Sequence, residues 1–475
     1  MASPWLFAFL CGLLTAPLAG ATLNSPAVLS LSSEIVKDKL TQELKNSDAT
    51  QILQQLPLLS EIQKEPASDI PIIGNLVDYL LNHIVWLKVT SANILQLQVQ
   101  PSANGQELVV KVPLSMVAGF NTPIVKTIVE MHMKTEIQAN IQVQTSESGQ
   151  PHLVLSDCSN SQDSLTITLL DKRLSFLVNS LAKEVMSLLM PALPKLVKSQ
   201  LCPVIQKAFE DSREDLLNLV KVPVTLGPDH LEFDILSPAI KDNFIQLNLG
   251  VKFLDSQGKV TQWFNESAAS LTMPTVVSAP FSLAFRQDVV NAAVGVLLPP
   301  GELMVLLNYV FPELAQQLKT SMKAINETAA EKLGPTQIVK ILIQETPDIF
   351  LAQGSATAVQ LIALELFATN EVSRPFFTLG IEASSEAQFY TEGDQLMLNL
   401  NEISSDRIYL MNSSFGLFNP DLLKDIVTQI LASVLLPNEN GKLRSGVQMS
   451  TVKAFGFESP SISLTKDALV ITAAA

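Results

Sequence analysis

The chain has 475 residues and a net charge of −15, from 31 Lys and Arg against 46 Asp and Glu. Apolar residues make up 47% and charged residues only 16%, although charged residues usually form about 25% of a globular chain. Residues 22–258 carry −7 (18 basic, 25 acidic) and residues 259–475 carry −8 (13 and 21), so neither half is basic. This charge balance argues against a nucleic-acid partner, and the length predicts two or three domains.

Residues 1–21, MASPWLFAFLCGLLTAPLAGA, are predicted to be a secretory signal peptide. Their centre is apolar and they end in Ala19-Gly20-Ala21, an A-x-A cleavage pattern, although a basic amino-terminal region is missing. Downstream, no uncharged apolar run approaches the roughly 18–20 residues that cross a bilayer. We therefore expect a secreted protein without a transmembrane anchor, whose apolar residues face inward.

The first half alternates between helical and extended patterns. Apolar residues at helical spacing predict a helix over 33–46, with Ile35, Val36, Leu40 and Leu44 on one face. Residues 125–144 then alternate apolar and polar side chains over about 20 positions, against a usual strand length of about 5–6 residues. Such a strand predicts an antiparallel sheet with one buried face and strong curl. Further strands are predicted at 95–100, 108–112, 152–158 and 164–170, and more helix at 48–59.

Residues 174–221 form the longest helical pattern, with apolar side chains at steps of three and four. Pro191 and Pro194 each remove a backbone hydrogen bond, so a bend is expected there, and another at Pro203. Two interpretations stay open. The helix is either a packed core helix or one wall of a cleft large enough for a lipid.

The second half repeats this plan, which predicts an internal duplication. Strands over 230–254 precede a polar, proline-containing passage at 259–278, interpreted as a linker between domains 22–258 and 279–475. Helical segments are predicted over 286–333, and Asn419 is predicted to cap a helix that starts at Pro420. Further strands are predicted at 338–344, 359–367, 377–389, 396–400 and 407–411.

Two cysteines, Cys158 and Cys202, remain after the signal peptide. An even pair in an oxidising compartment predicts a disulfide from the strand to the long helix, and two free buried thiols are the alternative. Three Asn-x-Ser/Thr sequons, at Asn265, Asn326 and Asn412, are candidate glycosylation sites on exposed segments.

The whole pattern resembles the BPI/LBP/CETP family of lipid-transfer and lipopolysaccharide-binding proteins. The resemblance rests on Cys158 and Cys202, on SSFGLFNPDLLKDIVTQILASVLLPNENGKLRSGVQM (413–449), on SLTKDALVIT (463–472), and on ILQQLPLLSEI and GFNTPIVKTIVE. It implies an α+β fold, an elongated two-domain boomerang in which each half is a highly curled antiparallel sheet or barrel with long helices. A central sheet would join the two halves, and each would have an apolar pocket for acyl chains.

The resemblance also implies a secreted lipid binder of mucosal innate defence, with phospholipid or a lipopolysaccharide-type lipid as partner. Lipopolysaccharide-binding members have a basic amino-terminal tip, and the acidic first half here argues against strong endotoxin binding. Curled strands with amphipathic helices would enclose space for acyl chains. The expected contacts are Ile35, Leu40, Met131, Met133, Leu181, Val185, Leu188 and Leu189 in the first half, and Val290, Val294, Leu423, Ile426 and Ile430 in the second.

No catalytic, cofactor-binding or metal-binding motif is present: GxSxG, HExxH, CxxC, GxGxxG and P-loop patterns are all missing, and the four histidines are scattered. Three function classes remain. The first is a non-enzymatic lipid-binding module, and the second is a surface-active or partner-binding protein whose pockets are only structural. The third is a hydrolase with residues too dispersed to recognise. Neither the identity of the lipid nor the oligomeric state follows from the sequence.

Overall fold

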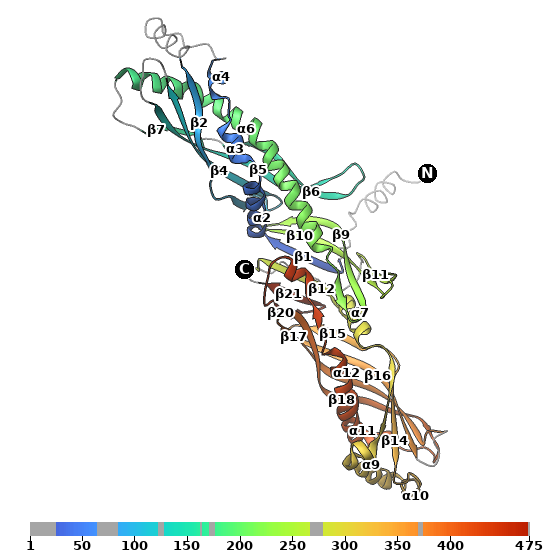
Figure 1. The fold of residues 1–475 in the computed structure, drawn as a ribbon. Helices are drawn as coiled ribbons and strands as arrows, with labels where there is room; N and C mark the ends of the chain where they lie inside the picture. Colours follow the sequence, from blue (N-terminus) through green and yellow to red (C-terminus); the bar gives the residue numbers. More distant parts are fainter. Residues whose placement is uncertain are drawn as a thin grey trace, which may run out of the picture.

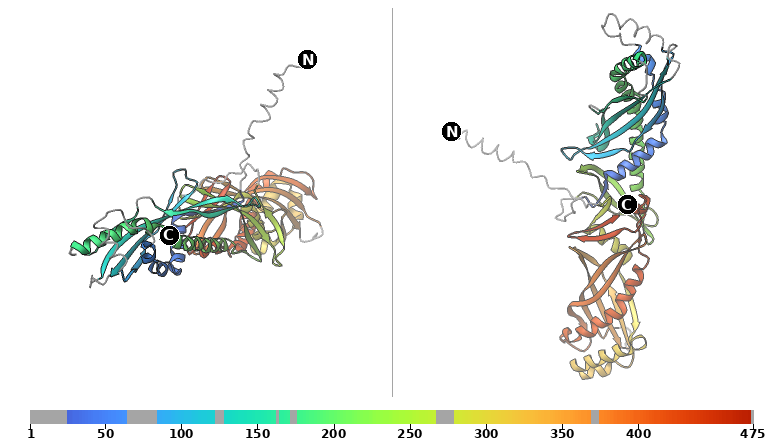
Figure 2. Two further views of the ribbon diagram at one scale, coloured as in Figure 1. Left: turned by 90° about the horizontal axis from the view of Figure 1, so that it is seen from above. Right: turned by 90° about the vertical axis from the view of Figure 1, so that its left-hand side faces the viewer.

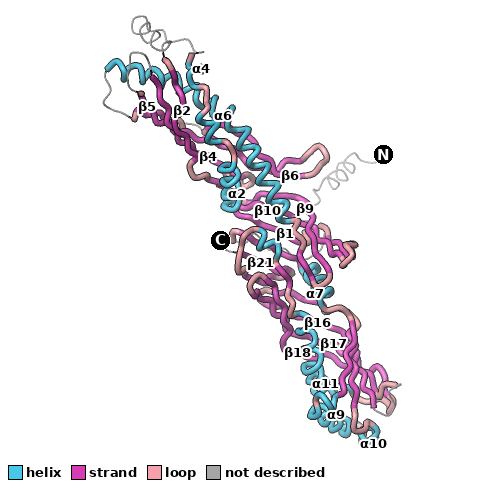
Figure 3. The backbone as a smooth tube through the Cα atoms, viewed as in Figure 1, coloured by secondary structure: helices cyan, strands magenta, loops and turns pink. Residues whose placement is uncertain are grey.

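The computed structural model describes residues 25–63, 84–121, 128–161, 164–170, 176–266, 279–368 and 374–473. The predicted signal peptide lies outside these residues. The molecule is elongated, with the two halves of the chain placed end to end (Figures 1 and 2). A sheet that contains strands from both halves lies between them, and the helices of each half run along its strands (Figure 3).

The first half contains one curled antiparallel sheet, ordered β2-β4-β5-β6, with β3 paired to β4 and β7 paired to β5. The strand β5 (Val129–Thr145) has 17 residues, and its buried positions alternate as predicted. The prediction at 125–127 lies outside the described residues. The other elements are α2 (Ser33–Asn46), α3 (Ala49–Gln54), α4 (Leu58–Ile62), β2 (Trp86–Ile94), β3 (Gln98–Pro101), β4 (Leu108–Asn121), β6 (Pro151–Asn160) and β7 (Thr166–Leu169).

The predicted long helix is α6 (Phe176–Val220), and it is continuous through all three prolines. Pro191 and Pro203 are exposed and Pro194 is half-buried, so the missing backbone donors lie mainly on the solvent side. The helix changes direction along its course: its first turns lie across the far end of the first half, and the rest runs toward the central sheet (Figures 1 and 2). Its buried face packs against α2, α3, α4 and β5.

The central sheet is antiparallel, in the order β20-β21-β12-β1-β10-β9-β8, with β11 paired to β10. The first half contributes β1 (Ala27–Ser32), β8 (Val224–Leu226), β9 (Asp229–Lys241), β10 (Phe244–Leu254) and β11 (Val260–Phe264). The second half contributes β12 (Phe281–Arg286), β20 (Ser461–Thr465) and β21 (Ala468–Ala473). Both halves meet where β1 pairs with β12, and Leu29 lies opposite Leu283.

The second half has its own curled antiparallel sheet, ordered β13-β14-β16-β17-β18-β19, with β15 paired to β16. Its strands are β13 (Gly301–Leu306), β14 (Gln337–Ile343), β15 (Asp348–Ala352), β16 (Ser355–Ala368), β17 (Phe377–Glu392), β18 (Gln395–Ser413) and β19 (Val447–Gln448). Its helices are α7 (Gln287–Leu297), α8 (Leu307–Val310), α9 (Pro312–Ile325), α10 (Glu327–Lys332), α11 (Lys424–Ile430), α12 (Leu436–Leu443) and α13 (Ser450–Ala454), with a 3₁₀ turn η1 (Pro420–Leu423) and a π turn η2 (Leu431–Leu435). Asn419 caps η1 as predicted, because its side chain accepts a hydrogen bond from Asp421 N at 3.1 Å.

Two predictions of local structure were wrong. Residues 301–306, predicted as helical, form β13, since Pro299 and Pro300 end the preceding helix and every second residue then faces the core. The strands predicted at 396–400 and 407–411 are one strand, β18, whose pairing with β17 shifts at irregularities. The predicted linker begins with a strand, because 260–264 form β11, while 267–278 lie outside the described residues. The domain division itself stays a prediction.

Candidate functional site

A β-bulge in β6 turns the side chain of Cys158 toward the long helix. Asp157 and Cys158 together face the single residue Ala139 of β5, and Asp157 has a positive φ of 52°. Before the bulge Leu155 faces the core, whereas after it Cys158 and Asn160 occupy the inner side. The extra residue therefore changes which side chains point inward.

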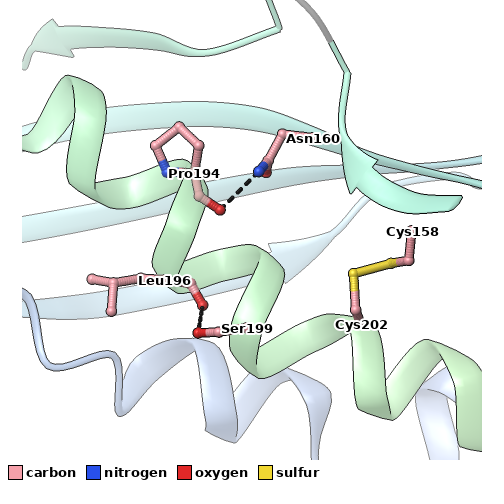
Figure 4. The surroundings of a disulfide bond; sticks show 6 residues. All are labelled: Cys158, Asn160, Pro194, Leu196, Ser199 and Cys202. Carbon is pink, nitrogen blue, oxygen red and sulfur yellow. Dashed lines mark hydrogen bonds between the residues drawn. A yellow bond between two sulfur atoms is a disulfide. The ribbon is translucent and has the colours of Figure 1, made fainter.

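A disulfide and a hydrogen bond tie the end of β6 to the middle of α6 (Figure 4). Cys158 and Cys202 form the predicted disulfide, so the alternative of two free thiols is wrong. Asn160 Nδ2 donates a hydrogen bond to the carbonyl oxygen of Pro194 at 2.8 Å, eight residues before Cys202. The middle of the long helix is thus held to the sheet by one covalent and one polar bond.

The residues predicted to contact lipid in the first half lie in packed core. Ile35 and Leu188 are half-buried, and the others are at most 1% exposed: Leu40, Met131, Met133, Leu181, Val185 and Leu189. They line none of the apolar cavities described below. The reason is that α2, α3 and α4 pack against this part of α6 and fill the space that the curled sheet encloses. Here the packed-core interpretation of the helix holds.

The first-half cavities lie further along, where the last turns of α6 reach the central sheet. The space that we call the inner cavity measures about 400 Å³, its mouth included, and is lined by Leu31, Val36, Leu153, Phe209, Ser212, Arg213, Leu216, Leu217, Ile245 and Leu247. An adjoining outer groove of about 630 Å³ is lined by Pro151, His152, Leu153, Arg213, Leu217, Ile235, Pro238 and Leu247. Four residues line both: Leu153, Arg213, Leu217 and Leu247.

A further apolar space, which we call the α7 cavity, lies between α7, α13 and the central sheet. Together with the open space at its mouth it measures about 850 Å³. No charged side chain lines it, and Thr451 supplies its polar side chain. The lining residues are Val224, Leu226, Leu231, Leu283, Phe285, Val289, Val290, Ala293, Val294, Leu297, Phe389, Leu396, Leu398, Leu443, Gly446, Val447, Met449, Thr451, Val452, Leu469 and Ile471. The first half of the chain contributes Val224, Leu226 and Leu231 to this wall.

Of the contacts predicted in the second half, Val290 and Val294 line the α7 cavity. Leu423, Ile426 and Ile430 are each at most 3% exposed and belong to a separate buried cluster toward the far end of this half. Of the helical residues chosen from the sequence, those on α7 therefore line this cavity and those at 423–430 do not, and the lipid contacts themselves stay predictions. The β12 and β21 residues were missed because their short apolar runs carry no period long enough to orient them.

The inner cavity and the α7 cavity occupy equivalent positions in the two halves. In each half a central-sheet strand leads directly into a helix, β1 into α2 and β12 into α7. Leu31 and Phe285 are each the fifth residue of their strand, and Val36 and Val290 are each the fourth residue of their helix. Each pair lines the cavity of its own half. The predicted duplication thus extends to the position of the cavities.

One carboxylic acid is buried in the second half. Glu439 on α12 is 1% exposed, and its Oε1 accepts a hydrogen bond from Gln360 Nε2 at 3.0 Å. Burial raises the pKa of Glu439 to about 7, against the lowering effects of the Gln360 hydrogen bond and of the charge on Lys442. Oε2 of Glu439 and Oε1 of Gln360 have no hydrogen-bond partner among the described residues. This acid lies beside Leu443, which lines the α7 cavity.

The three sequon asparagines, Asn265, Asn326 and Asn412, are all exposed. Asn326 also caps α10, since its Oδ1 accepts a hydrogen bond from Ala329 N at 3.0 Å. Over the described residues, no group of three or more His, Cys, Asp or Glu side chains is placed to hold a metal ion. The cavities described above therefore offer a ligand mainly apolar surfaces.

Comparison with known proteins places this architecture in a family. The model for the N-terminal domain of the LBP / BPI / CETP family matches residues 39–218, and the model for its C-terminal domain matches residues 266–475. The chain belongs to the LBP / BPI / CETP family. Among LBP / BPI / CETP relatives, BPI fold-containing family B member 1 of Homo sapiens is 65% identical over 474 residues, which cover 100% of this chain and 98% of that protein. The protein of the same name from Mus musculus is 57% identical, with 100% of both chains covered.

The crystal structure of lipopolysaccharide binding protein has the same fold. It covers 95% of this chain and 99% of its own, with a TM-score of 0.52 at 15% sequence identity. The predicted α+β architecture of two curled halves joined by a central sheet is confirmed. Within the described part of this LBP / BPI / CETP family member, no helix is both long and apolar enough to span a bilayer.

Proposed function

We propose that this member of the LBP / BPI / CETP family is a secreted, non-enzymatic protein that holds phospholipid or bacterial lipid in apolar cavities, as part of mucosal innate defence. The α7 cavity carries the proposal. Its wall is apolar apart from Thr451, and it has no charged group that would have to lose water when an acyl chain enters. Family membership supports a lipid as ligand.

The driving force for binding is removal of the acyl chain from water. Each buried methylene contributes about 0.8 kcal/mol, so even a partly enclosed chain gains several kcal/mol. An empty apolar cavity loses the dispersion contacts that its lining could make, which also favours occupancy. The signal peptide predicted at 1–21 and the disulfide support secretion.

Extraction of the secreted protein with organic solvent, followed by mass spectrometry, tests the proposal. We expect co-purified lipid at about one molecule or more per chain, and renewed uptake of phospholipid after its removal. A protein that carries no lipid and takes up none would exclude the carrier function.

A second candidate function is surface activity, with cavities that serve only the structure. Exposed apolar side chains near α8 and in the loop before η1 favour it, because Leu417 is 97% exposed, Tyr309 77% and Val310 55%. The surface tension of lipid-free protein separates the two functions. A marked fall in surface tension without lipid uptake would favour this alternative.

A further inference from the structure

Two of the three sequon asparagines follow an exposed aromatic side chain. Trp263 stands two residues before Asn265, and Tyr409 stands three residues before Asn412. Trp263 is 57% exposed and Tyr409 is 45% exposed. The third asparagine, Asn326, follows Thr-Ser-Met-Lys-Ala-Ile, a stretch without an aromatic residue. It is therefore an internal reference for the other two sites.

Lys252 supports the ring of Trp263. The two residues lie opposite each other where β10 pairs with β11, and Lys252 Nζ is 5.7 Å from the centre of the ring. An ion pair of 2.5 Å between Lys252 Nζ and Asp234 Oδ2 holds the ammonium in place. Asn265 directly follows β11, so the alternation of side chains in an extended chain puts it on the same side as Trp263. The exposed part of the ring is thus open to a group attached to Asn265.

Gly380 supports the ring of Tyr409. The two residues pair across β17 and β18, and a Cβ added to Gly380 would collide with Cζ, Cε2 and Oη of Tyr409. The ring therefore lies directly over the glycine, which a residue with a side chain would prevent. The neighbours Leu379 and Ile381 belong to the buried cluster of this half, so the ring is on the outer face of the sheet.

A bulge in β18 brings Asn412 to the same outer face. Leu410 pairs with Leu379, and Asn412 pairs with Thr378, so Met411 is an extra residue in the strand. Without this bulge, side chains three positions apart would lie on opposite faces of the sheet. The extra residue therefore places the sequon asparagine on the face that also carries the exposed tyrosine.

The first sugar of an asparagine-linked glycan suits such a ring chemically. During secretion the side-chain nitrogen of the asparagine displaces a lipid pyrophosphate from C1 of N-acetylglucosamine and loses one proton, which forms the linkage. The C–H groups of this sugar carry partial positive charge, whereas the face of an aromatic ring is negative. Contact between them also removes apolar ring surface from water.

We propose that Asn265 and Asn412 carry glycans whose first N-acetylglucosamine packs on Trp263 and Tyr409, respectively, whereas a glycan on Asn326 extends into water. The two sugars then cover exposed aromatic surface in a chain with only 16% charged residues, which limits apolar contact between molecules. This inference concerns the outer surface of both halves and does not depend on the proposed lipid binding.

The test is an NMR spectrum of the sugar C–H groups in the full-length protein. The protein is secreted from cells fed isotope-labelled glucosamine, and each glycan is trimmed enzymatically to its first sugar. An aromatic ring shifts the protons above it upfield, so the Asn265 and Asn412 signals should lie upfield of the Asn326 signals. Removing one sequon at a time assigns the signals, and the same spectrum in concentrated urea supplies a second reference.

Replacing each ring tests the contact itself. Trp263→Leu should move the Asn265 signals, and only those, to the position of the Asn326 signals. Tyr409→Leu should do the same for the Asn412 signals, whereas Tyr409→Phe keeps a ring and should keep the upfield shift. The two rings are thereby tested independently in one protein.

The matched control is Tyr390→Leu. Tyr390 is 39% exposed in the same sheet, but it pairs with Met397 near the opposite end of β18, so its loss should change no sugar signal. Unshifted signals from Asn265 or Asn412 would overturn the inference, as would the absence of sugar from either residue. Equal loss of the shift in the control and in Tyr409→Leu would overturn it too. If a variant does not fold, the wild-type spectrum still decides, because it contains both sites and the reference.

Discussion

Ser32 and Pro280 join the two halves of the molecule, because the backbone N–H of Ser32 donates a hydrogen bond to the carbonyl oxygen of Pro280 at 2.8 Å. The reciprocal bond runs from Arg286 N to the carbonyl oxygen of Pro26 at 2.9 Å. The two bonds flank the paired strands β1 and β12. They are equivalent in the internal repeat that also makes the two cavities equivalent, in which β1 and α2 correspond to β12 and α7. The halves are thus built on one shared sheet, and each cavity lies where a strand of that sheet enters a helix.

Loss of the disulfide should destabilise the first half. The two cysteines are 44 residues apart, and a loop of that length gives about 4 kcal/mol of stabilisation in the chain-entropy model. The double variant Cys158→Ala, Cys202→Ala should lower the free energy of unfolding in urea by roughly that amount. Non-reducing peptide mapping of the wild type should show the linked pair. Two thiols that react with an alkylating agent in the native protein would contradict the structure.

Filling the α7 cavity should displace lipid without unfolding the protein. Val290→Trp adds a large side chain at a lining position, so bound lipid should fall by about one molecule per chain while the urea midpoint stays nearly constant. The matched control is Val185→Trp, which enlarges a fully buried residue in the packed part of α6. That change should cost about 1–3 kcal/mol through overpacking and leave lipid content unchanged. Unaltered lipid uptake by Val290→Trp would remove the α7 cavity from the binding site.

Stability should increase as the pH falls from about 7 toward 5. The pKa of Glu439 is about 7 in the folded protein and 4.5 when unperturbed, so the folded state binds this proton more tightly than the unfolded state. The stability that Glu439 adds by binding this proton is therefore fully present below pH 4.5. It is lost as the pH rises through about 7, and its magnitude is of order 3 kcal/mol. Glu439→Gln, which is neutral at every pH, should remove this part of the dependence. The measurement is the urea midpoint of both proteins from pH 5 to 8, and parallel curves would show that Glu439 is not the titrating group.

At least two of the three sequons should carry glycans, because all three asparagines are exposed. Stepwise gel shifts on glycosidase treatment would count the occupied sites. Asn265→Gln and Asn412→Gln should each remove one step. For the third sequon Thr328→Ala is the better variant, since Asn326→Gln would also remove the cap of α10. The absence of any shift would mean that the sequons are not used.

The sequence was most informative where a pattern is long. The alternation in β5, the amphipathic period of α6 and the cap at Asn419 each determine local structure from side chains that are close in sequence. Short strands were missed, because β1, β12 and β13 have only six residues each and owe their pairing to distant segments. Bulges were also missed, and the one at Asp157 decides that Cys158 points toward the helix.

The cavities could be predicted only in part. Val290 and Val294 follow from the apolar face of α7, but the opposite wall comes from β8, β12, β18 and β21, which meet only in the folded chain. On α6 the pattern continues unchanged from Leu181 to Leu216, so the sequence gives no sign of where packing ends and space begins. That boundary depends on α2, α3 and α4, which cover the first part of the helix and leave the last turns to face the cavity.

The most direct measurement maps where an acyl chain lies. A phospholipid with a photoreactive group in its acyl chain would be taken up by the full-length protein, cross-linked, and located by peptide mass spectrometry. We expect adducts within 224–231, 281–297, 389–398 and 443–452, which contain residues that line the α7 cavity. Adducts confined to the exposed apolar residues at 304–310 and 411–422, or none above the level of Val290→Trp, would contradict it.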